Sequence, residues 1–403
     1  MSHIVIIGAG QAGCSLVVKL RNLGFEGKVT LIGEEPVPPY QRPPLSKKYL
    51  LGEMDLERLY LRPKSYYDEA NITLRLGKPV SSIDTTAKTV TVGDETISYH
   101  QLALTTGSVP RHLPDAIGGA LQGVHVVRTL ADVDGMAPEF TSGRRVLIVG
   151  GGYIGLEAAA VASKLGVQVT LVEMADRILQ RVAAPETSDY FRKLHQSHGV
   201  NILEGLGLER LLGEGRVSGA RFTDGSETDV DFVIVGVGIM PGSTLAEVAG
   251  LTIENGIKVD AQGRTSDPAI WSAGDCASFP YKGNRIRLES VQNAIDQAEL
   301  VAENILGAGK EYVPMPWFWS DQFGTKLQIA GLNTGYDTIV VRPGDKGDAV
   351  SHWYYKGDTL LAVDAMNDPR SYMIGKRLIE SGKSPAPSVI ANPDTDMKAL
   401  LKA

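Results

Sequence analysis

Two segments far apart in the chain repeat one pattern of apolar residues and glycines. Residues 4–13 read IVIIGAGQAG and residues 146–155 read VLIVGGGYIG. In each copy a short apolar run breaks into glycines and continues as a segment with helical character. A second apolar run follows each copy, at 28–32 and at 167–172. The repeat therefore predicts two βαβ units, each contributing parallel strands to its own sheet.

The glycines in both copies have the spacing G-x-G-x-x-G. The first glycine permits a tight turn, the second lets the backbone approach a pyrophosphate, and the third lets helix and strand pack closely. An acidic residue at the end of the next strand then accepts hydrogen bonds from ribose hydroxyls. A purely structural turn is the alternative, but it does not explain the acid in both copies. The predicted dinucleotide contacts are Gly8, Gly10, Gly13 and Glu34 in the first copy, and Gly150, Gly152, Gly155 and Glu173 in the second.

Glu173 also bears on the choice between NADH and NADPH. A carboxylate beside the adenosine ribose repels a 2′-phosphate, so the sequence favours NADH. Arg177 follows four residues later and could lie near the adenosine, where it would partly offset this repulsion.

A third stretch of sequence supplies a further candidate contact for a dinucleotide. Residues 265–277 read TSDPAIWSAGDCA, an apolar strand that ends in Gly274 and Asp275. Ligands of doubly wound sheets lie at the carboxyl ends of strands, although GD can also be a simple turn. Two dinucleotide sites in one chain are most economically filled by one flavin and one nicotinamide nucleotide.

The remaining pattern divides the chain. Apolar runs at 102–105 and 231–237 end in small residues and a proline, which marks exits from domains. A helical segment follows Asp275. From Pro314 to Pro385 strands alternate with turns, as in an α+β domain. The tail from Ser384 is rich in Pro, Asn and Asp, so we expect it to pack loosely. The predicted division is 1–110, 111–239, 240–315 and 316–403.

Composition excludes several classes. A net charge of -7 works against broad nucleic-acid or anionic-membrane binding. Cys14 and Cys276 cannot build a disulfide framework, and neither they nor the seven histidines have metal-ligand spacing, so we predict no metal site. The first strand begins at His3, leaving no room for a signal peptide, and no apolar stretch reaches the roughly 18 residues of a membrane span. A cytoplasmic location is expected.

Seven segments together resemble one enzyme family, the FAD-dependent, NADH-linked ferredoxin reductases of bacterial cytochrome P450 and Rieske-type oxygenase systems. Putidaredoxin reductase and the biphenyl dioxygenase reductase are members. The resemblance implies an α/β fold with two Rossmann-like dinucleotide-binding domains, a glutathione-reductase-like architecture, and a C-terminal α+β domain. Residues 1–110 and 240–315 would form the FAD domain, and 111–239 the NADH domain. The segments are IVIIGAGQAG, YQRPPLSKKYL, LALTTGSVPR, LIVGGGYIGLE, TSDPAIWSAGD, ESVQNAIDQA and PWFWSDQ.

The resemblance also implies site residues. In the family the lysine of LSK, here Lys47, approaches the flavin N5 and pairs with the glutamate that here is Glu157. A cation there would stabilise the negative charge of a reduced flavin. Trp319 is expected at the flavin edge, whereas Trp317 is as well explained by core packing. Implied FAD contacts are Ala12, Glu34, Arg42, Lys47, Val80, Thr106, Gly107, Arg128, Asp275, Val291 and Trp319, and implied NAD contacts besides the glycines and Glu173 are Tyr153, Ile154 and Gly238.

The expected activity is hydride transfer from NADH to FAD followed by single-electron transfers to a [2Fe-2S] ferredoxin, which in turn serves a P450 or another oxygenase. Disulfide-reductase chemistry is excluded because PPLSKK carries no cysteine. The alternatives are a monodehydroascorbate-reductase-like enzyme acting on a small radical or quinone, and an NADH-sensing flavoprotein similar to apoptosis-inducing factor.

Both this protein and its expected partner are acidic, so docking would need a local basic rim. Arg62, Lys64 and Lys326 are the candidates for that rim. Glu299 departs from the family pattern, because putidaredoxin reductase has a basic docking residue there.

Overall fold

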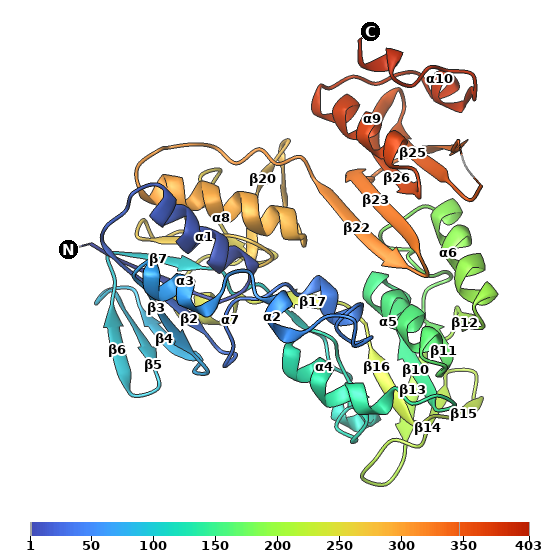
Figure 1. Cartoon of the computed structure of the whole chain (residues 1–403), viewed down its shortest axis with the longest axis horizontal. Helices are drawn as coiled ribbons and strands as arrows, with labels where there is room; N and C mark the ends of the chain where they lie inside the picture. Colours follow the sequence, from blue (N-terminus) through green and yellow to red (C-terminus); the bar gives the residue numbers. More distant parts are fainter. Residues whose placement is uncertain (1, 346, 403) are drawn as a thin grey trace. The chain divides into compact units, whose positions relative to one another are not determined.

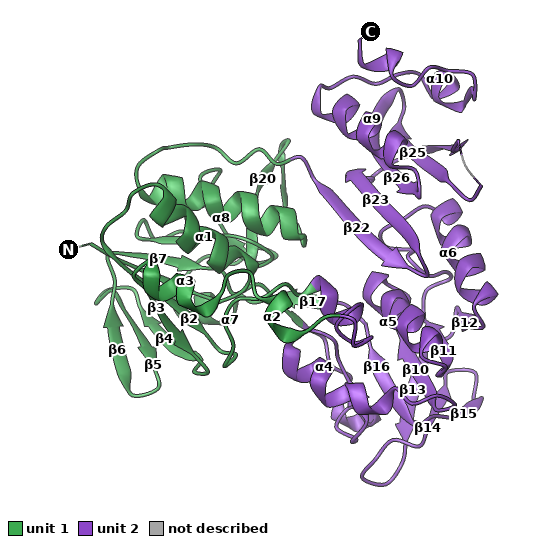
Figure 2. Cartoon of the chain, in the orientation of Figure 1, with its two compact units in different colours: residues 1–42, 54–109, 239–314 green, residues 43–53, 110–238, 315–403 purple. Residues whose placement is uncertain are grey.

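The chain forms two compact units in a computed structural model that describes residues 2–345 and 347–402. Unit 1 consists of residues 1–42, 54–109 and 239–314, and unit 2 of residues 43–53, 110–238 and 315–403 (Figures 1 and 2). The chain therefore passes between the units at several points, which places segments distant in sequence in the same unit. The four-part division expected from the sequence stays a prediction.

Unit 1 is built on a five-stranded parallel sheet with the strand order β19-β7-β1-β2-β3. Helices α1 and α8 lie side by side against it (Figure 1). Its elements are β1 His3–Ile7, α1 Gln11–Asn22, β2 Lys28–Gly33, α2 Leu56–Leu59, α3 Lys64–Glu69, β3 Ile72–Leu76, β4 Val80–Asp84, β5 Thr89–Val92, β6 Glu95–Ser98, β7 Gln101–Leu104, β8 Ser108–Pro110, β17 Ile239–Pro241, α7 Thr244–Val248, β18 Ile257–Lys258, β19 Ile270–Ser272, β20 Ala277–Tyr281, β21 Asn284–Ile286 and α8 Val291–Ile305.

Unit 2 contains a second parallel sheet, with the order β12-β11-β10-β16-β9. A small antiparallel sheet, β13-β14-β15, accompanies it. The elements of this part are a 3₁₀ turn at Pro43–Ser46, β9 Val124–His125, α4 Leu130–Met136, β10 Arg145–Val149, α5 Tyr153–Lys164, β11 Gln168–Glu173, α6 Pro185–Ser197, β12 Asn201–Glu204, β13 Leu208–Leu212, β14 Gly219–Phe222, β15 Glu227–Asp229 and β16 Phe232–Val235.

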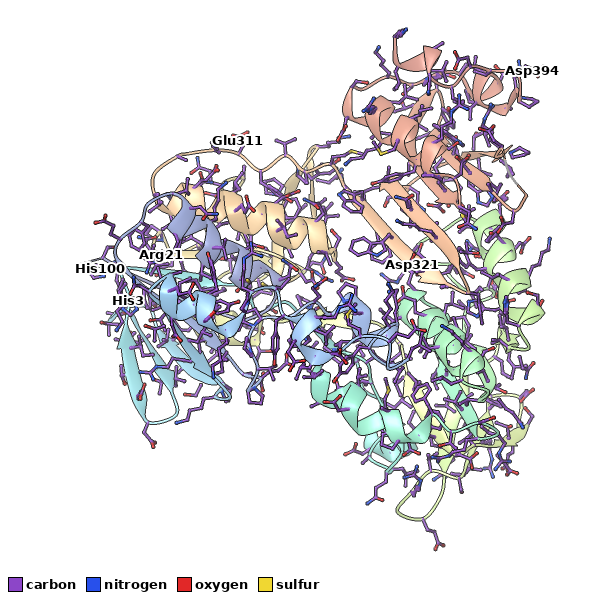
Figure 3. The ribbon with its side chains drawn as sticks, viewed as in Figure 1. His3, Arg21, His100, Glu311, Asp321 and Asp394 are labelled. Carbon is purple, nitrogen blue, oxygen red and sulfur yellow. The ribbon has the colours of Figure 1, made fainter. Side chains whose placement is uncertain are left out.

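The two parallel sheets confirm the predicted repeat. In each, the strand before the glycines pairs in parallel with the strand after the helix, with Ile4 opposite Val29 and Val146 opposite Val169. Strand β1 is buried along its whole length. A strand of a parallel sheet that is covered on both faces is expected to be a continuous apolar run, as residues 4–7 are. Its first residue, His3, donates its backbone N–H to Nδ1 of His100 at 3.0 Å and has a structural role (Figure 3).

The last part of unit 2 is an antiparallel sheet with helices, as expected for an α+β domain. The strand order is β22-β23-β26-β25-β24, and α9 packs on it. The elements are β22 Trp317–Gln322, β23 Thr325–Gly331, β24 Thr338–Pro343, β25 Val350–Lys356, β26 Thr359–Met366, α9 Pro369–Glu380 and α10 Pro387–Ala391.

The expectation of a loosely packed tail is wrong. Ile390 and Met397 are 0% and 4% exposed and join the apolar core around Trp353. Arg342 donates to the carbonyl oxygens of Ile390 and Asn392, and to two more along the tail. The two terminal nitrogens of the guanidinium thus tie four backbone oxygens of the tail to β24.

The described residues, 2–345 and 347–402, bear on membrane spans and on metal sites. Among them, no helix combines the length and apolar character needed to cross a bilayer. In the same part of the chain, His, Cys, Asp and Glu side chains do not gather in groups of three or more that could hold a metal ion.

Candidate functional site

The three glycines of the first motif have three different surroundings. Gly8 has a φ of +111°, and a Cβ there would lie 2.2 Å from the carbonyl oxygen of Thr105. At Gly13 a Cβ would lie 2.0 Å from the carbonyl oxygen of Gly8, so the helix packs directly on the turn. At Gly10 a Cβ would meet nothing within 4 Å. The loop therefore leaves open space only beside the glycine that would face a pyrophosphate.

Helix α1 starts at this open position. Its N-cap residue, Gly10, supplies no side-chain cap, and the first turn contains no acidic residue. Backbone N–H groups at such a terminus favour an anionic ligand. The geometry fits the pyrophosphate of FAD.

The second motif repeats the arrangement in unit 2. Gly150 has a φ of +106°, and a Cβ there would lie 2.4 Å from the carbonyl oxygen of Gly236. A Cβ at Gly155 would lie 2.2 Å from the carbonyl oxygen of Gly150, whereas one at Gly152 would meet nothing within 4 Å. Helix α5 begins after Gly152, again without a side-chain cap. Both loops thus offer the same cradle for a dinucleotide.

The acid of the first unit follows a strand that touches the glycine loop. A Cβ at Gly33 would lie 2.6 Å from the Cβ of Ala9, so β2 ends against the loop and Glu34 emerges beside it, exposed to solvent. The neighbouring Glu35 binds Nη2 of Arg42 at 2.6 Å and the hydroxyl of Tyr40 at 2.6 Å. Arg42 is therefore held close to this end of the sheet.

Asp275 lies in a turn between two helix N-termini of unit 1. A Cβ at Gly274 would lie 3.1 Å from the Cβ of Ala12 in α1 and 3.8 Å from that of Ala294 in α8. Oδ2 of Asp275 accepts a hydrogen bond of 2.9 Å from the Ser108 hydroxyl. The turn thus brings Asp275 to Ala12 and to the first turn of α8, which starts at Val291.

The other FAD residues expected in unit 1 lie in two places. Thr106 and Gly107 follow β7, where the Thr106 hydroxyl donates to the carbonyl oxygen of Gly242 and Gly107 has a φ of +64°. Val80 starts β4 and packs against the apolar core on one side of the sheet. Cys276 is fully buried next to Ser272, and the structure records Cys276 and Cys14 as free thiols.

Glu173 lies against the second glycine loop. Its Oε2 accepts from the backbone N–H of Gly151 at 2.7 Å, and its Oε1 from that of Ala175 at 2.8 Å. The guanidinium of Arg177 instead donates to the Ser188 hydroxyl and, at 2.9 Å, to the carbonyl oxygen of Ala183. Arg177 therefore braces the start of α6, which argues against the expectation that it faces the adenosine.

Three further residues of the second site lie around α5 and β16. Tyr153 starts α5 with its hydroxyl buried, and burial raises its pKa well above the usual value. Ile154 is 45% exposed. Gly238, with a φ of +102°, follows β16, and its carbonyl oxygen accepts from the backbone N–H of Arg111.

The structure contains the ion pair that the resemblance implied. Nζ of Lys47 lies 2.6 Å from Oε2 of Glu157, whose side chain is only 3% exposed. Lys47 directly follows the 3₁₀ turn. The last residue of the turn, Ser46, also donates to Oε2 of Glu157 at 2.8 Å. From the other side, the Ser320 hydroxyl donates to Oε1 at 2.7 Å. Sequence reasoning missed both serines although they lie in YQRPPLSKKYL and PWFWSDQ, because the sequence does not indicate which acceptor a serine hydroxyl will meet.

The tryptophans of β22 share a face, as the alternation of side chains predicted. The rings of Trp317 and Trp319 lie 5.5 Å apart between centroids. Trp317 packs with Tyr372 against the α9 side of the sheet, which supports a core role for it. The flavin-edge role of Trp319 stays a prediction, as does the FAD contact of Arg128, which precedes α4 and donates its backbone N–H to Asp132 at 3.1 Å.

The docking candidates are exposed but belong to different units. Arg62 and Lys64 lie at the start of α3 in unit 1, and Lys326 lies on β23 in unit 2. Glu299, on α8, pairs with Lys19 at 3.2 Å. The basic rim stays a prediction.

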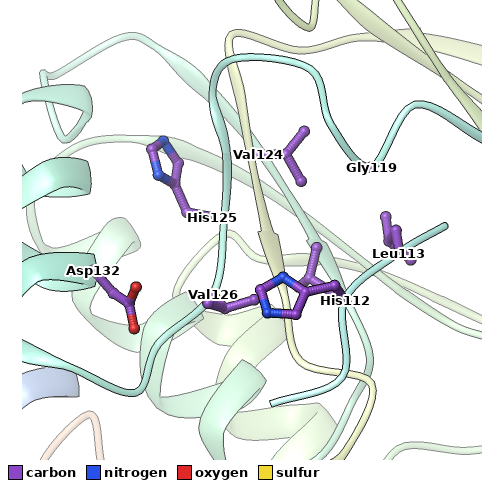
Figure 4. Close-up of a pocket in the computed structure, with 8 residues that line it drawn as sticks. His112, Leu113, Gly119, Val124, His125, Val126 and Asp132 are labelled. Atoms are coloured by element: carbon purple, nitrogen blue, oxygen red, sulfur yellow. The ribbon is translucent and has the colours of Figure 1, made fainter. Parts of the chain in front are cut away.

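A separate pocket of about 190 Å³ lies in unit 2 (Figure 4). None of the residues predicted from the sequence lines it. Its walls are formed by His112, Leu113, Gly119, Val124, His125, Val126, Asp132 and Val235.

Comparison with known proteins identifies the family. Residues 2–298 match the family described as pyridine nucleotide-disulphide oxidoreductase. The chain belongs to this family. Residues 317–401 match a second family, described as reductase C-terminal. The family name refers to disulfides, but residues 43–53 contain no cysteine, and Cys14 and Cys276 are free thiols.

Similar proteins narrow the class. Rhodocoxin reductase of Rhodococcus erythropolis is 43% identical over 402 residues, covering 99% of this chain and 94% of that protein. A ferredoxin–NAD(P)+ reductase of Sphingomonas sp is 43% identical over 384 residues, covering 94% and 92%. The structure of the covalent putidaredoxin reductase–putidaredoxin complex matches with a TM-score of 0.95 at 37% identity, covering 100% and 98%. The chain therefore belongs to the family of these ferredoxin reductases, and the predicted fold class, enzyme class and cofactors, FAD and NAD(H), are confirmed.

Proposed function

We propose that this chain carries electrons from NADH through FAD to a [2Fe-2S] ferredoxin, which then serves a cytochrome P450 or another oxygenase. The balance is one NADH and two oxidised ferredoxins giving NAD+, two reduced ferredoxins and one proton. FAD, when bound, supplies the conversion between a two-electron donor and single-electron acceptors. The observation that carries the proposal is one chain that holds two matched dinucleotide cradles and an ion pair of Lys47 with the buried Glu157.

The residues of the chain bind and orient. The loops at Gly10 and Gly152 leave room for pyrophosphates at the ends of α1 and α5. Glu34 and Glu173 stand beside these loops, where each would hold ribose hydroxyls. Gly274, the neighbour of Asp275, packs against Ala12 and against the first turn of α8, which starts at Val291, and Asp275, Ala12 and Val291 would contact FAD there.

Lys47 has the role of a fixed cation. Its side chain is 18% exposed and its ammonium group is held by Glu157, so the position of the cation is set before any substrate arrives. A cation fixed in this way stabilises negative charge without reorganisation. The proposal places Lys47 beside the flavin, with no side chain acting as a general base.

The carboxylate of Glu173 makes NADH the proposed donor. Its two oxygens accept backbone N–H groups at the glycine loop, so the negative charge is fixed where a 2′-phosphate would lie. Arg177 donates to Ser188 and to the carbonyl oxygen of Ala183, so its guanidinium is held by the start of α6.

The cytoplasm is the proposed location. Cys14 and Cys276 are both buried free thiols, a state compatible with a reducing compartment.

The decisive experiment measures cytochrome c reduction by NADH with and without an added [2Fe-2S] ferredoxin. We expect slow reduction by the FAD-loaded protein alone and a strong acceleration that saturates with ferredoxin. A rate that ferredoxin leaves unchanged would contradict the proposal and favour a quinone or radical reductase, or a sensor, over a ferredoxin reductase.

A further inference from the structure

One face of β22 contacts one face of α5 at two successive positions. Side chains alternate along a strand, so Phe318, Ser320 and Gln322 point the same way. On α5, Tyr153 and Glu157 are four residues apart and share a face. The rings of Phe318 and Tyr153 lie 5.2 Å apart, and Ser320 donates to Glu157. Two strand residues advance about 6.6 Å and four helical residues about 6 Å, so both contacts form at once.

Ser320 is itself held by a chain of buried side chains. Nε2 of Gln322 donates to the Ser320 hydroxyl oxygen at 3.0 Å, so the amide oxygen of Gln322 faces Nε2 of His195, which lies 2.8 Å away. Burial lowers the pKa of His195 to about 4, so the ring is neutral at neutral pH. Because the amide oxygen can only accept, the proton of the ring is on Nε2.

In the series of hydrogen bonds from His195 to Glu157, each donor points toward Glu157. The order is His195 to Gln322, Gln322 to Ser320, and Ser320 to Oε1 of Glu157. Ser320, Gln322 and His195 are each no more than 1% exposed. Buried polar groups of this kind hold a fixed geometry, because water is not at hand to replace a lost partner.

The two oxygens of Glu157 are therefore held from opposite sides. Lys47 and Ser46 bind Oε2, and Ser320 binds Oε1. Without the Ser320 hydroxyl, Oε1 would lose a charge-assisted bond in a buried place, and the carboxylate would turn toward other donors and carry the ammonium of Lys47 with it.

We propose that Ser320 is a positioning residue for the Glu157–Lys47 pair, held in place by Gln322 and His195. By this route the C-terminal sheet takes part in setting the cation beside the flavin. The inference rests on the proposed function for its effect on flavin reduction, but the positioning itself is a property of unit 2.

The first test measures the position of Lys47 without using activity. FAD-loaded protein is labelled with a limiting amount of acetic anhydride, and acetylation of Lys47 is quantified by mass spectrometry relative to the exposed Lys88. We expect Ser320→Ala to change the relative labelling of Lys47 severalfold, and Ser320→Thr, which keeps the hydroxyl, to return it toward wild type.

Ser351→Ala is the matched control. Ser351 is also 0% exposed, lies in the same sheet on β25, and bonds to Trp353 and Arg342 instead of Glu157. Its loss should lower stability without changing the labelling of Lys47. Equal labelling in wild type, Ser320→Ala and Ser351→Ala would overturn the inference.

The second test measures flavin bleaching by NADH in a stopped-flow instrument. Ser320→Ala should slow the limiting rate about tenfold and leave the dissociation constant of NADH unchanged, because one bond to a charged group is lost away from the nucleotide loop. Ser320→Thr should restore the rate, and Ser351→Ala should match wild type.

A third variant covers a failure of Ser320→Ala to fold. Gln322→Met removes the amide that holds Ser320 but keeps the hydroxyl, so it should change Lys47 labelling in the same direction and by less. Wild-type labelling in Gln322→Met would count against the chain of bonds. Altered labelling in Ser320→Ala, combined with wild-type bleaching in Lys47→Ala, would refute the proposed role of Lys47 and leave the positioning intact.

Discussion

Lys47 and Glu157 form an ion pair of 2.6 Å although 110 positions separate them in the sequence. Both residues lie in unit 2, which takes residues 43–53 from the middle of segments that otherwise belong to unit 1. The pair is mostly buried and shares its carboxylate with two serine hydroxyls. Its geometry makes the function of the pair directly testable.

Lys47→Ala and Glu157→Gln should slow flavin bleaching by NADH at least about tenfold, because each removes or frees the cation that the pair holds. The KM for ferredoxin should stay within about twofold, since neither change touches the proposed rim. Lys48→Ala, an exposed neighbour, is the control. Wild-type bleaching in both variants would reduce the pair to a structural contact.

Substitutions at two of the three glycines of the first motif should separate FAD binding from folding. Gly10→Val places a side chain in open space, so the protein should fold and lose noncovalently bound FAD. Gly13→Val forces contact with the Gly8 carbonyl and should lower the melting temperature of the FAD-free protein. Visible absorbance after gel filtration and a thermal melt measure the two effects. If the Gly10→Val protein stayed yellow, it would still bind FAD, which would contradict the prediction that the pyrophosphate lies beside Gly10.

The preference for NADH over NADPH in kcat/KM should be at least about tenfold, equivalent to about 1.4 kcal/mol. Glu173→Ala should narrow the ratio, because the fixed negative charge is gone. Arg177→Ala should lower stability and leave the ratio unchanged, since its guanidinium bonds to Ser188 and Ala183. Steady-state rates with both nucleotides decide this, and an unchanged ratio in Glu173→Ala would remove the residue from the site.

Added salt should slow ferredoxin-dependent turnover while NADH-dependent bleaching changes little, because exposed charges steer encounter and are screened. Charge reversal of Arg62 or Lys326 should raise the apparent KM for ferredoxin, whereas reversal of the exposed Lys88 should not. Turnover that is indifferent to ionic strength would mean that docking depends on apolar contact near Trp319 instead.

A buried acid should give stability an unusual dependence on pH. Burial raises the pKa of Asp364 to about 6, although Tyr354 and Thr187 donate to it. The folded state therefore holds this proton more tightly than the unfolded chain, so the contribution of Asp364 to stability falls as pH rises from about 4 to about 6. Asp364→Asn should flatten that part of a plot of the free energy of unfolding against pH, by a few kcal/mol at most. An unchanged plot would argue that Asp364 ionises as freely as in an unfolded chain.

The sequence alone was sufficient for the two βαβ units, their glycine loops and the residues beside them. G-x-G-x-x-G can be recognised as a local pattern, because the turn, the open position and the contact between the first and third glycines all lie within six residues. Glu34 and Glu173 were found in the same way, since each closes the next strand. The resemblance to a family added Lys47 and Glu157, which no spacing in this chain connects.

Only the tertiary structure decided which groups meet across the chain. Nothing in the sequence links Ser320 to Glu157, and their contact forms because two residues of β22 and four residues of α5 advance by nearly the same distance. Arg177 looked available to a nucleotide until its bonds to Ser188 and Ala183 were seen. The tail looked loose until Arg342 supplied donors for its carbonyls. Local patterns determine what a segment forms, but a side chain's partner depends on the packing of distant segments, which no local spacing records.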